Sequence, residues 1–471
     1  MFRINQHVKI VEVHSDTDST NSSCSNERLG QELVSAINID DLPYELLIEI
    51  FSYLSVEDLA LQVRKVSRKW EELAEDNRLW KHLTYTPSHR HTELEIIDVL
   101  KQAPKLQRFI PPYHLSRKRF FQTIAEHCKD MRVLAISAEE DKDTVEKLVS
   151  ECQNMESFTV HSHDFSKTKI LQIVSKFQNL KNLKLTGDMS VRNHNIFADI
   201  SLGCPSLDTL DLQHLSNYSN NNLEFFLKEK KDKILCLYLE CCRPREPCSL
   251  PMIFELCTTL QHLKVRGHAG TTSSKELISL KKMKNLKSLF MDHFVYYKIN
   301  HLADYLQTQY ARNLVCLSLG RFSGSVEELS NCICMNCCKL KHLNLGHCPR
   351  LRDDGLKFIG NLRDLRKLYL VSCCCLTDEG VSYIVRCTQI SYLNLNGCGN
   401  ISHDGFVLCL ENLKMLNELC IDACRMEPHA LMRVPQELKN LRKLKIRHRD
   451  EREMNHVISA LRKNVPYLQI Q

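Results

Sequence analysis

The sequence lacks several features that would assign it to a membrane, to a secretory route or to a common class of enzyme. No run approaches the roughly 18 apolar residues of a membrane span. The first residues, MFRINQHVKIVEVHSD, contain no apolar core of a secretory signal. The motifs G-x-S-x-G, Walker loop and H-E-x-x-H are all missing. We therefore expect a non-enzymatic protein of the cytoplasm and/or nucleus that needs no cofactor.

An excess of one charge is also missing. The 63 basic and 57 acidic residues leave a net charge of +6, which by itself does not indicate nucleic acid as a partner. We expect neither nucleic acid nor a membrane as a partner, although locally basic strands keep nucleic acid as a third alternative. Large apolar side chains are absent from residues 14–27, HSDTDSTNSSCSNE, so residues 1–37 are predicted to form a disordered tail.

What the sequence does contain begins with LPYELLIEIFSYL, residues 42–54. On a helical wheel its apolar residues span an arc of roughly 220°, whereas a surface helix facing one core needs only a little over ~100°. The excess indicates either burial on all sides or contact with two different surfaces, one of them on another chain. Ser55 is expected to cap a second helix, a third runs through Val66, Trp70 and Leu73, and Arg78 begins a fourth. Residues 38–85 thus form a small helical bundle.

Beyond a helix predicted at 92–103, with Leu94, Ile97 and Leu100 on one face, the sequence repeats itself. The pattern L-x-x-L-x-L recurs about every 26 residues. Its first apolar position falls at Met131, Met155, Leu180, Leu207, Ile234, Leu260, Leu286, Leu314, Leu340, Leu365, Ile390, Leu416 and Leu441. Degenerate units lie at Leu106 and Val465, so the array spans residues 92–471.

The period predicts the fold. Each L-x-L places two side chains on one face of a short strand, and the remaining residues suffice for a helical return. Strands stack about 4.8 Å apart while helices are roughly 10 Å wide, so the stack must curve. We expect an α/β protein in which a helical bundle precedes a curved solenoid, with a parallel sheet on the concave face.

Repeat-defined positions also explain 11 of the 23 cysteines. Six lie three residues before the first apolar position, and five lie eight residues after it. Without an export signal, the cysteines are expected to be reduced thiols with no disulfides. The five that lie eight residues after the first apolar position are in the turn after the strand, where a small buried thiol can pack and bond weakly to the loop backbone. The spacing of Cys332, Cys334, Cys337 and Cys338 looks like that of a zinc site. Zinc sites usually need two convergent ligand pairs, and no second pair is evident, so we expect structural thiols here. His161 and His163 likewise lack a third ligand, and no metal is expected.

The array resembles the cysteine-containing class of leucine-rich repeats, with LTDEGV and LRDDGL at the start of return helices. The bundle, with LPYELLIEIFSYLSVEDLA, VSRKWEEL and RLW, resembles an F-box. Together they resemble F-box and leucine-rich-repeat proteins. The resemblance implies a substrate-recognition subunit of an SCF-type cullin-RING E3 ubiquitin ligase, in which the F-box binds the Skp adaptor and, through it, the cullin and RING subunits. A non-catalytic scaffold that uses its F-box in a ligase-independent complex is the alternative.

Carried over by position, the resemblance implies that one side of the first helix packs on Val66 and Trp70 while the adaptor covers the other. The adaptor-facing candidates are Leu42, Pro43, Leu46, Ile50 and Leu54, supported by Leu59 and Val66. An unknown protein substrate would bind the concave face. The substrate-binding candidates are Tyr238, Glu240, Lys264, Arg266, Phe290 and Asp292, on three adjacent predicted strands. The alternative is a solvated face on which the aromatic residues fall by chance. A second group, Lys443, Lys445 and Arg447, is either simply solvated or favours an acidic or phosphorylated partner.

Overall fold

The computed structural model describes the chain from Ile39 onward with internal gaps. The described residues are 39–112, 118–137, 141–163, 165, 170–188, 196–216, 218, 220–240, 250–266, 274–293, 300–322, 326–422, 427–447, 451–464 and 469–470. The predicted tail, residues 1–37, and Val465 lie outside them.

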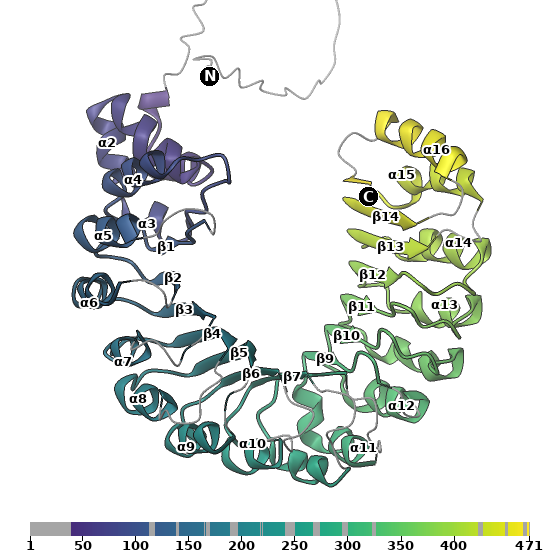
Figure 1. Cartoon of the computed structure of the whole chain (residues 1–471). Coiled ribbons are helices and arrows are strands. Elements are labelled where there is room, and N and C mark those ends of the chain that lie inside the picture. Colours follow the sequence, from purple (N-terminus) through teal and green to yellow (C-terminus); the bar gives the residue numbers. More distant parts are fainter. Residues whose placement is uncertain are drawn as a thin grey trace, which may run out of the picture.

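A parallel sheet lines the inside of a horseshoe, and its strands follow one another in chain order (Figure 1). The strands are β1 (Arg108–Phe109), β2 (Val133–Ser137), β3 (Ser157–Ser162), β4 (Asn182–Asp188), β5 (Thr209–Ser216), β6 (Cys236–Glu240), β7 (His262–Arg266), β8 (Ser288–Asp292), β9 (Cys316–Ser318), β10 (His342–Asn344), β11 (Lys367–Tyr369), β12 (Tyr392–Leu395), β13 (Glu418–Asp422), β14 (Lys443–Arg447) and β15 (Gln469–Ile470). The curved α/β solenoid predicted from the repeat length is therefore confirmed.

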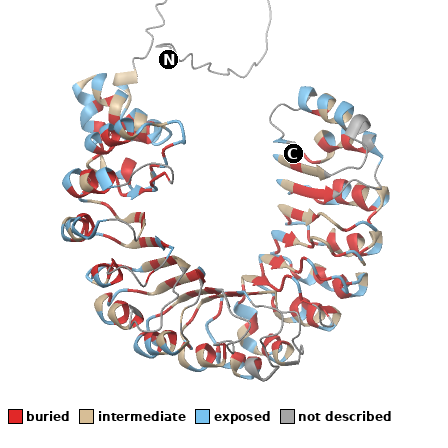
Figure 2. Ribbon diagram, viewed as in Figure 1, coloured by how far each residue is buried: buried red, intermediate tan, exposed pale blue. Residues whose placement is uncertain are grey.

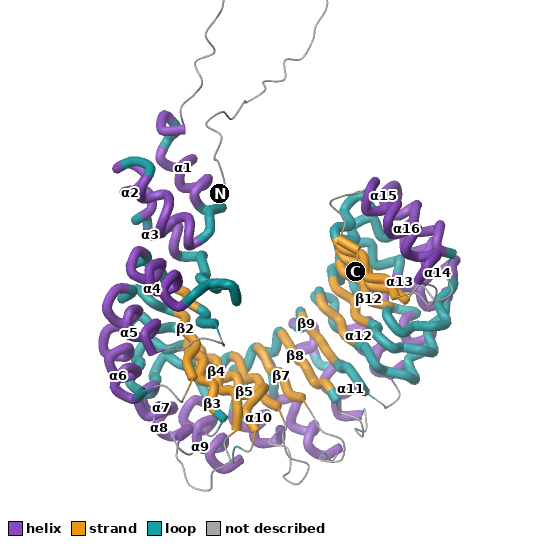
Figure 3. The backbone as a smooth tube through the Cα atoms, turned by 45° about the horizontal axis from the view of Figure 1, so that its top comes forward, coloured by secondary structure: helices purple, strands orange, loops and turns teal. Residues whose placement is uncertain are grey.

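Helices form the outer layer of the horseshoe (Figure 3). They are α4 (Glu93–Gln102), α5 (Lys118–His127), α6 (Lys142–Glu151), α7 (Ile170–Val174), α8 (Ile196–Gly203), α9 (Asn220–Lys230), α10 (Leu250–Leu256), α11 (Asn300–Leu306), α12 (Val326–Asn336), α13 (Asp378–Ile384), α14 (His403–Asn412), α15 (Val434–Glu437) and α16 (Glu451–Asn464). Several returns are 3₁₀ turns instead: η5 (Ser274–Lys282), η6 (Gln309–Asn313), η7 (Asp353–Leu356), η8 (Ile359–Asn361) and η9 (Pro428–Arg433). Among the described residues, no helix is long and apolar enough to cross a membrane.

The core is a continuous layer between strands and helices (Figure 2). All thirteen first apolar positions of the repeat are buried, from Met131 to Leu441. One repeat cannot bury its leucines alone, but neighbours on both sides complete the layer. Leu94 is an exception to the prediction for α4: its side chain is 65% exposed, and Ile96 packs inward beside Ile97 and Leu100 instead.

The repeat-placed thiols link neighbouring repeats. Cys128 Sγ donates to the carbonyl of Leu100 at 3.2 Å, and Cys398 Sγ donates to that of Leu370 at 3.0 Å. Burial raises the pKa of Cys128 to about 12, which keeps this thiol protonated and able to donate. At the turn place, the predicted packing and weak backbone bonding are confirmed for Cys348, Cys373 and Cys398. Cys242 and Cys424 lie outside the described residues.

Short helices at the N-terminal end form the predicted bundle. They are η1 (Ile39–Asp41), α1 (Tyr44–Phe51), the π-helical turn η2 (Asp58–Gln62), η3 (Val63–Lys65), α2 (Arg68–Ala74) and α3 (Asn77–Trp80). Side chains cap them locally: Asp58 N donates to Ser55 Oγ at 3.0 Å, and Trp70 N donates to Ser67 Oγ at 3.2 Å. These bonds satisfy backbone groups that a short helix leaves unpaired.

Candidate functional site

Helix α1 has two apolar sides. One side is buried in the bundle through Leu47, Ile48 and Phe51. The Phe51 ring meets the Trp70 ring edge to face, with centroids 4.9 Å apart. The contact with Trp70 is the one that the sequence predicted. This side accounts for the part of the apolar arc that a single core requires.

The other side of α1 is apolar and faces solvent. Leu46 is 46% exposed, Ile50 39% and Tyr53, which follows the helix, 82%. Pro43 is exposed one turn before Leu46. These four residues follow one another at spacings of three or four positions, so they share one side of the helix. We call Pro43, Leu46, Ile50 and Tyr53 the α1 surface. A contiguous exposed apolar surface of this kind marks a contact with another molecule.

Four other adaptor candidates occupy different environments. Leu59 is fully buried in the bundle, so it does not lie on the exposed side, and its supporting role in adaptor binding stays a prediction. Leu42 and Leu54 are half-buried and pack on the bundle core. The sequence predicted that the first helix packs on Val66 as well as on Trp70. Val66 is 57% exposed, so it contributes little to that packing. The wheel could not separate these positions because they lie outside α1 or at its ends.

Asp76 ties α1 to the rest of the bundle. Its carboxylate accepts hydrogen bonds from the Tyr44 hydroxyl at 2.9 Å, from the Arg78 guanidinium at 2.8 Å and from the Arg78 backbone N–H at 2.7 Å. The hydrogen bond from the Arg78 guanidinium is the main cause that lowers the Asp76 pKa from 3.8 to about 2. The same residue therefore caps α3 and holds the first turn of α1.

Asp76→Ala is expected to lower the free energy of unfolding by about 1 kcal/mol at neutral pH, the usual size of a helix-cap effect. Because the pKa of Asp76 is lower in the folded state, its ionised form stabilises the protein above about pH 3.8 and loses this effect as the pH falls toward 2. Urea unfolding midpoints of the wild type and the variant, measured at neutral pH and near pH 2, test this. Asp41→Ala, at an exposed position, is the control. A difference that stays constant with pH would contradict the role of the carboxylate charge.

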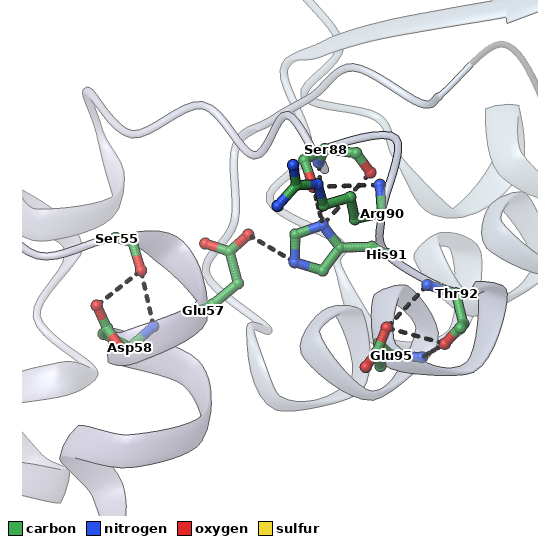
Figure 4. Close-up of polar contacts among 8 residues, drawn as sticks. All are labelled: Ser55, Glu57, Asp58, Ser88, Arg90, His91, Thr92 and Glu95. Atoms are coloured by element: carbon green, nitrogen blue, oxygen red, sulfur yellow. Dashed lines mark hydrogen bonds and ion pairs between the residues drawn. The ribbon is translucent and has the colours of Figure 1, made fainter. Parts of the chain in front are cut away.

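The bundle is joined to the first repeats by polar contacts and a shared core (Figure 4). The His91 ring lies 3.9 Å from the Glu57 carboxylate and also contacts Ser88. Thr92 and Glu95 form a reciprocal capping box at the start of α4. Tyr85 donates its backbone N–H to the Arg108 carbonyl at 2.9 Å, which adds a bridge to the edge of the sheet. The α1 surface is therefore fixed in position relative to the horseshoe.

The six substrate candidates come together on the concave face in two rows. Tyr238, Lys264 and Phe290 are in register on β6, β7 and β8. The second row, also in register, is Glu240, Arg266 and Asp292. The side chain of Glu240 is outside the described part. Burial is the main cause that raises the pKa of Tyr238 to about 12, so its hydroxyl remains a hydrogen-bond donor.

Asp292 has a structural task within this set. Its carboxylate accepts hydrogen bonds from Ser318 Oγ at 2.7 Å and from the Gly320 N–H at 3.0 Å. It therefore fixes the turn after β9. Tyr238, Phe290 and Lys264 are half-exposed and Arg266 is exposed, so these four can contact a partner.

Sequence reasoning missed a second concave cluster. It considered the residues between and after the two core leucines, but the residue before them lies on the same face. Tyr392 is in that place, and its ring lies 4.6 Å from that of Tyr369. Strand alternation alone could have found Tyr392. The second basic group of the sequence analysis lies on β14. The charges of Lys443 and Lys445 are partly neutralised by the Glu418 carboxylate, which lies 3.8 and 3.3 Å from their amino groups. The Arg447 side chain lies outside the described part.

The alternative metal clusters do not assemble among the described residues. No group of three or more metal-ligating side chains is found there. Within the cysteine cluster, Cys334 is buried on α12, whereas Cys338 is exposed beyond the end of that helix, so the two do not lie on one helix face. The rings of His161 and His163 lie 5.3 Å apart, and His161 bonds to Thr186 instead.

Comparison with protein families places known modules on these parts of the chain. The F-box-like family model matches residues 39–86, and the leucine-rich-repeat model matches residues 336–360 and 361–385. The chain is thus a leucine-rich-repeat solenoid preceded by an F-box-like bundle.

Curated relatives carry the same combination in their names. Bovine F-box/LRR-repeat protein 12 is 44% identical over 46 residues, which is 10% of this chain and 14% of that protein. F-box/LRR-repeat protein 5 of Xenopus tropicalis is 40% identical over 57 residues, 12% of this chain and 8% of that protein. Each match spans a small part of the relative. The chain is thus similar to F-box/LRR-repeat proteins within these short segments.

A solved structure shares the fold over most of the chain. A chain from the crystal structure of the yeast Rad7 and Elc1 complex gives a TM-score of 0.52 at 13% identity, covering 91% of this chain and 90% of that one. At this identity the likeness concerns the fold alone.

Proposed function

We propose that this protein is a substrate receptor of an SCF-type cullin-RING ubiquitin ligase. The observation that carries the proposal is the exposed α1 surface within the F-box-like segment, because an apolar helix side left in water favours a dedicated partner. A Skp adaptor would cover this surface and connect the chain to the cullin and RING subunits. The solved chain of similar fold comes from a crystal structure of a two-protein complex, that of yeast Rad7 and Elc1.

The concave face would hold the protein to be ubiquitinated. Tyr238 and Phe290 supply aromatic anchors, and Lys264 and Arg266 supply charge beside them. Aromatic and arginine side chains are the usual hot spots of protein interfaces. The chain itself would perform no covalent step. It would hold its substrate at a fixed place relative to the adaptor, because the bundle and the repeats share one core. We place this role in the cytoplasm and/or nucleus, where thiols stay reduced.

Ubiquitin transfer separates this proposal from the ligase-independent scaffold. Proteins bound to the purified chain would be incubated with adaptor, cullin, RING subunit, ubiquitin and its activating and conjugating enzymes. We expect ubiquitin on a bound protein with the wild-type chain, and roughly 30-fold less with Tyr238→Ala/Phe290→Ala, since the two lost anchors cost about 1 kcal/mol each.

The control is adaptor capture, which should be equal for both chains because the concave face is remote from the α1 surface in the horseshoe (Figure 1). Adaptor capture without ubiquitin transfer to any bound protein would favour the scaffold.

A further inference from the structure

Four consecutive repeats hold a side chain in a strained backbone conformation at the same place. His293, Arg321, His347 and Ser372 have φ values of 68°, 61°, 58° and 57°. Each lies four residues after the first core leucine of its strand, from β8 to β11. The left-handed conformation is unfavourable for residues with a Cβ atom and is most easily adopted by glycine. The next repeat uses Gly397 at this place, with φ 77°.

The backbone needs the conformation but not these side chains. The N–H of His293 donates to the Gly320 carbonyl, that of Arg321 to the Gly346 carbonyl and that of His347 to the Val371 carbonyl, at 2.9, 2.9 and 2.5 Å. These bonds extend the ladder between repeats beyond the strands, and glycine would donate them equally well. The presence of large basic side chains at three of these strained positions therefore points to a role beyond the fold.

The three basic residues form one row along the rim of the sheet. The ladder sets them one repeat apart, about 5 Å in the direction across the strands. Arg266 adds a fourth member, because its guanidinium lies 3.2 Å from the His293 ring. We call Arg266, His293, Arg321 and His347 the basic rim. It borders the second row of substrate candidates at Asp292, whose carboxylate is engaged by Ser318 and Gly320.

Two members of the basic rim are available to a partner. Arg321 and His347 are exposed, and neither side chain has a hydrogen-bond or ion-pair partner in the described part of the chain. Arg350, in the turn that follows His347, is also exposed and without an ion pair there. A guanidinium and imidazole side by side offer several N–H donors to a carboxylate, and charge-assisted bonds of this kind are stronger than neutral ones.

We propose that the basic rim binds an acidic segment, rich in aspartate or glutamate, of the substrate protein. The inference rests on the proposed receptor function and adds the chemistry of its partner. The aromatic anchors Tyr238 and Phe290 would hold the apolar part of the substrate, and the rim would fix the acidic part at the carboxyl-terminal ends of β8 to β10.

The test uses the full-length chain and a fluorescent peptide of alternating glutamate and serine. Its glutamine and phosphoserine versions serve as uncharged and phosphorylated probes. We expect the glutamate peptide to bind, and the double variant Arg321→Gly/His347→Gly to bind it roughly tenfold more weakly at low salt. The same variant should unfold at a higher temperature, because glycine relieves the strain at both positions. Ser372→Gly is the matched control: it removes strain at the next position of the ladder and should leave peptide binding unchanged.

Three results would overturn the proposal: no binding of the glutamate peptide by the wild-type chain, equal binding by the double variant, or a lower unfolding temperature of that variant, which would show that the side chains serve the fold. Binding of the phosphoserine peptide alone would overturn the carboxylate assignment. None of these results depends on adaptor capture or ubiquitin transfer, so failure here is distinguishable from failure of the receptor function.

Discussion

Leu46→Asp/Ile50→Asp is expected to reduce capture of a Skp adaptor by about 100-fold or more. An interface residue whose loss costs about 1.4 kcal/mol weakens binding about tenfold, so two such residues give a factor of this size. The aspartates add a further cost, since two unpaired charges would be buried against an apolar partner. Both residues are already partly exposed to water in the isolated chain, at 46% and 39%, so stability should change by only about 0.5 kcal/mol per site.

Pull-down with purified adaptor measures this effect, with circular dichroism to confirm that the variant is folded. Leu202→Asp is the matched control, because Leu202 is 70% exposed on α8, in the outer layer of the solenoid. It introduces one aspartate on an exposed helix position without touching the α1 surface. Equal capture by the double variant and the wild type would show that the adaptor does not use this surface, and the receptor proposal would lose its main support.

Leu343→Ala is expected to destabilise the protein by about 3–4 kcal/mol, as for a buried leucine whose cavity cannot collapse. Leu343 is fully buried on β10, in register with Leu317 and Leu368 on the neighbouring strands. Each repeat is stabilised by its neighbours, so the loss of a core side chain in the middle of the array weakens the packing between the repeats on either side of β10.

Leu94→Ala is the informative comparison, since sequence periodicity placed Leu94 in the core and the structure leaves it 65% exposed. We expect a change within about 0.5 kcal/mol for this variant. Urea unfolding of both variants, followed by circular dichroism, distinguishes the two sites. Similar destabilisation by both would contradict the structure around α4.

The fold was predictable because it repeats. A single period with two leucines on one strand face requires a stack, and the unequal widths of strands and helices require its curvature. Thirteen matches to one pattern are too many to arise by chance. All thirteen first apolar positions, from Met131 to Leu441, are buried as expected. The same register brought Tyr238, Lys264 and Phe290 together from three separate segments.

The candidate sites were only partly predictable, since a helical wheel gives the direction of a side chain but not what lies opposite it. Leu59 and Val66 are both apolar and close in sequence, yet Leu59 is fully buried and Val66 is 57% exposed. The cause is the irregular segment of η2 and η3, whose π and 3₁₀ turns change the residue periodicity between them. Likewise, no pattern indicated that Asp292 would bond to the turn of the next repeat.

The amino-acid sequence by itself determined the architecture of this protein, because the spacing of apolar side chains is visible within each repeat and recurs in all of them. It also determined the two-sided character of α1, since the apolar arc is wider than one core can cover. Only the tertiary structure decided which residues are free to bind. The packing of Phe51 on Trp70 leaves Leu46 and Ile50 in water. The ladder between repeats sets Arg321 beside His347, because contacts between distant segments depend on how the repeats stack.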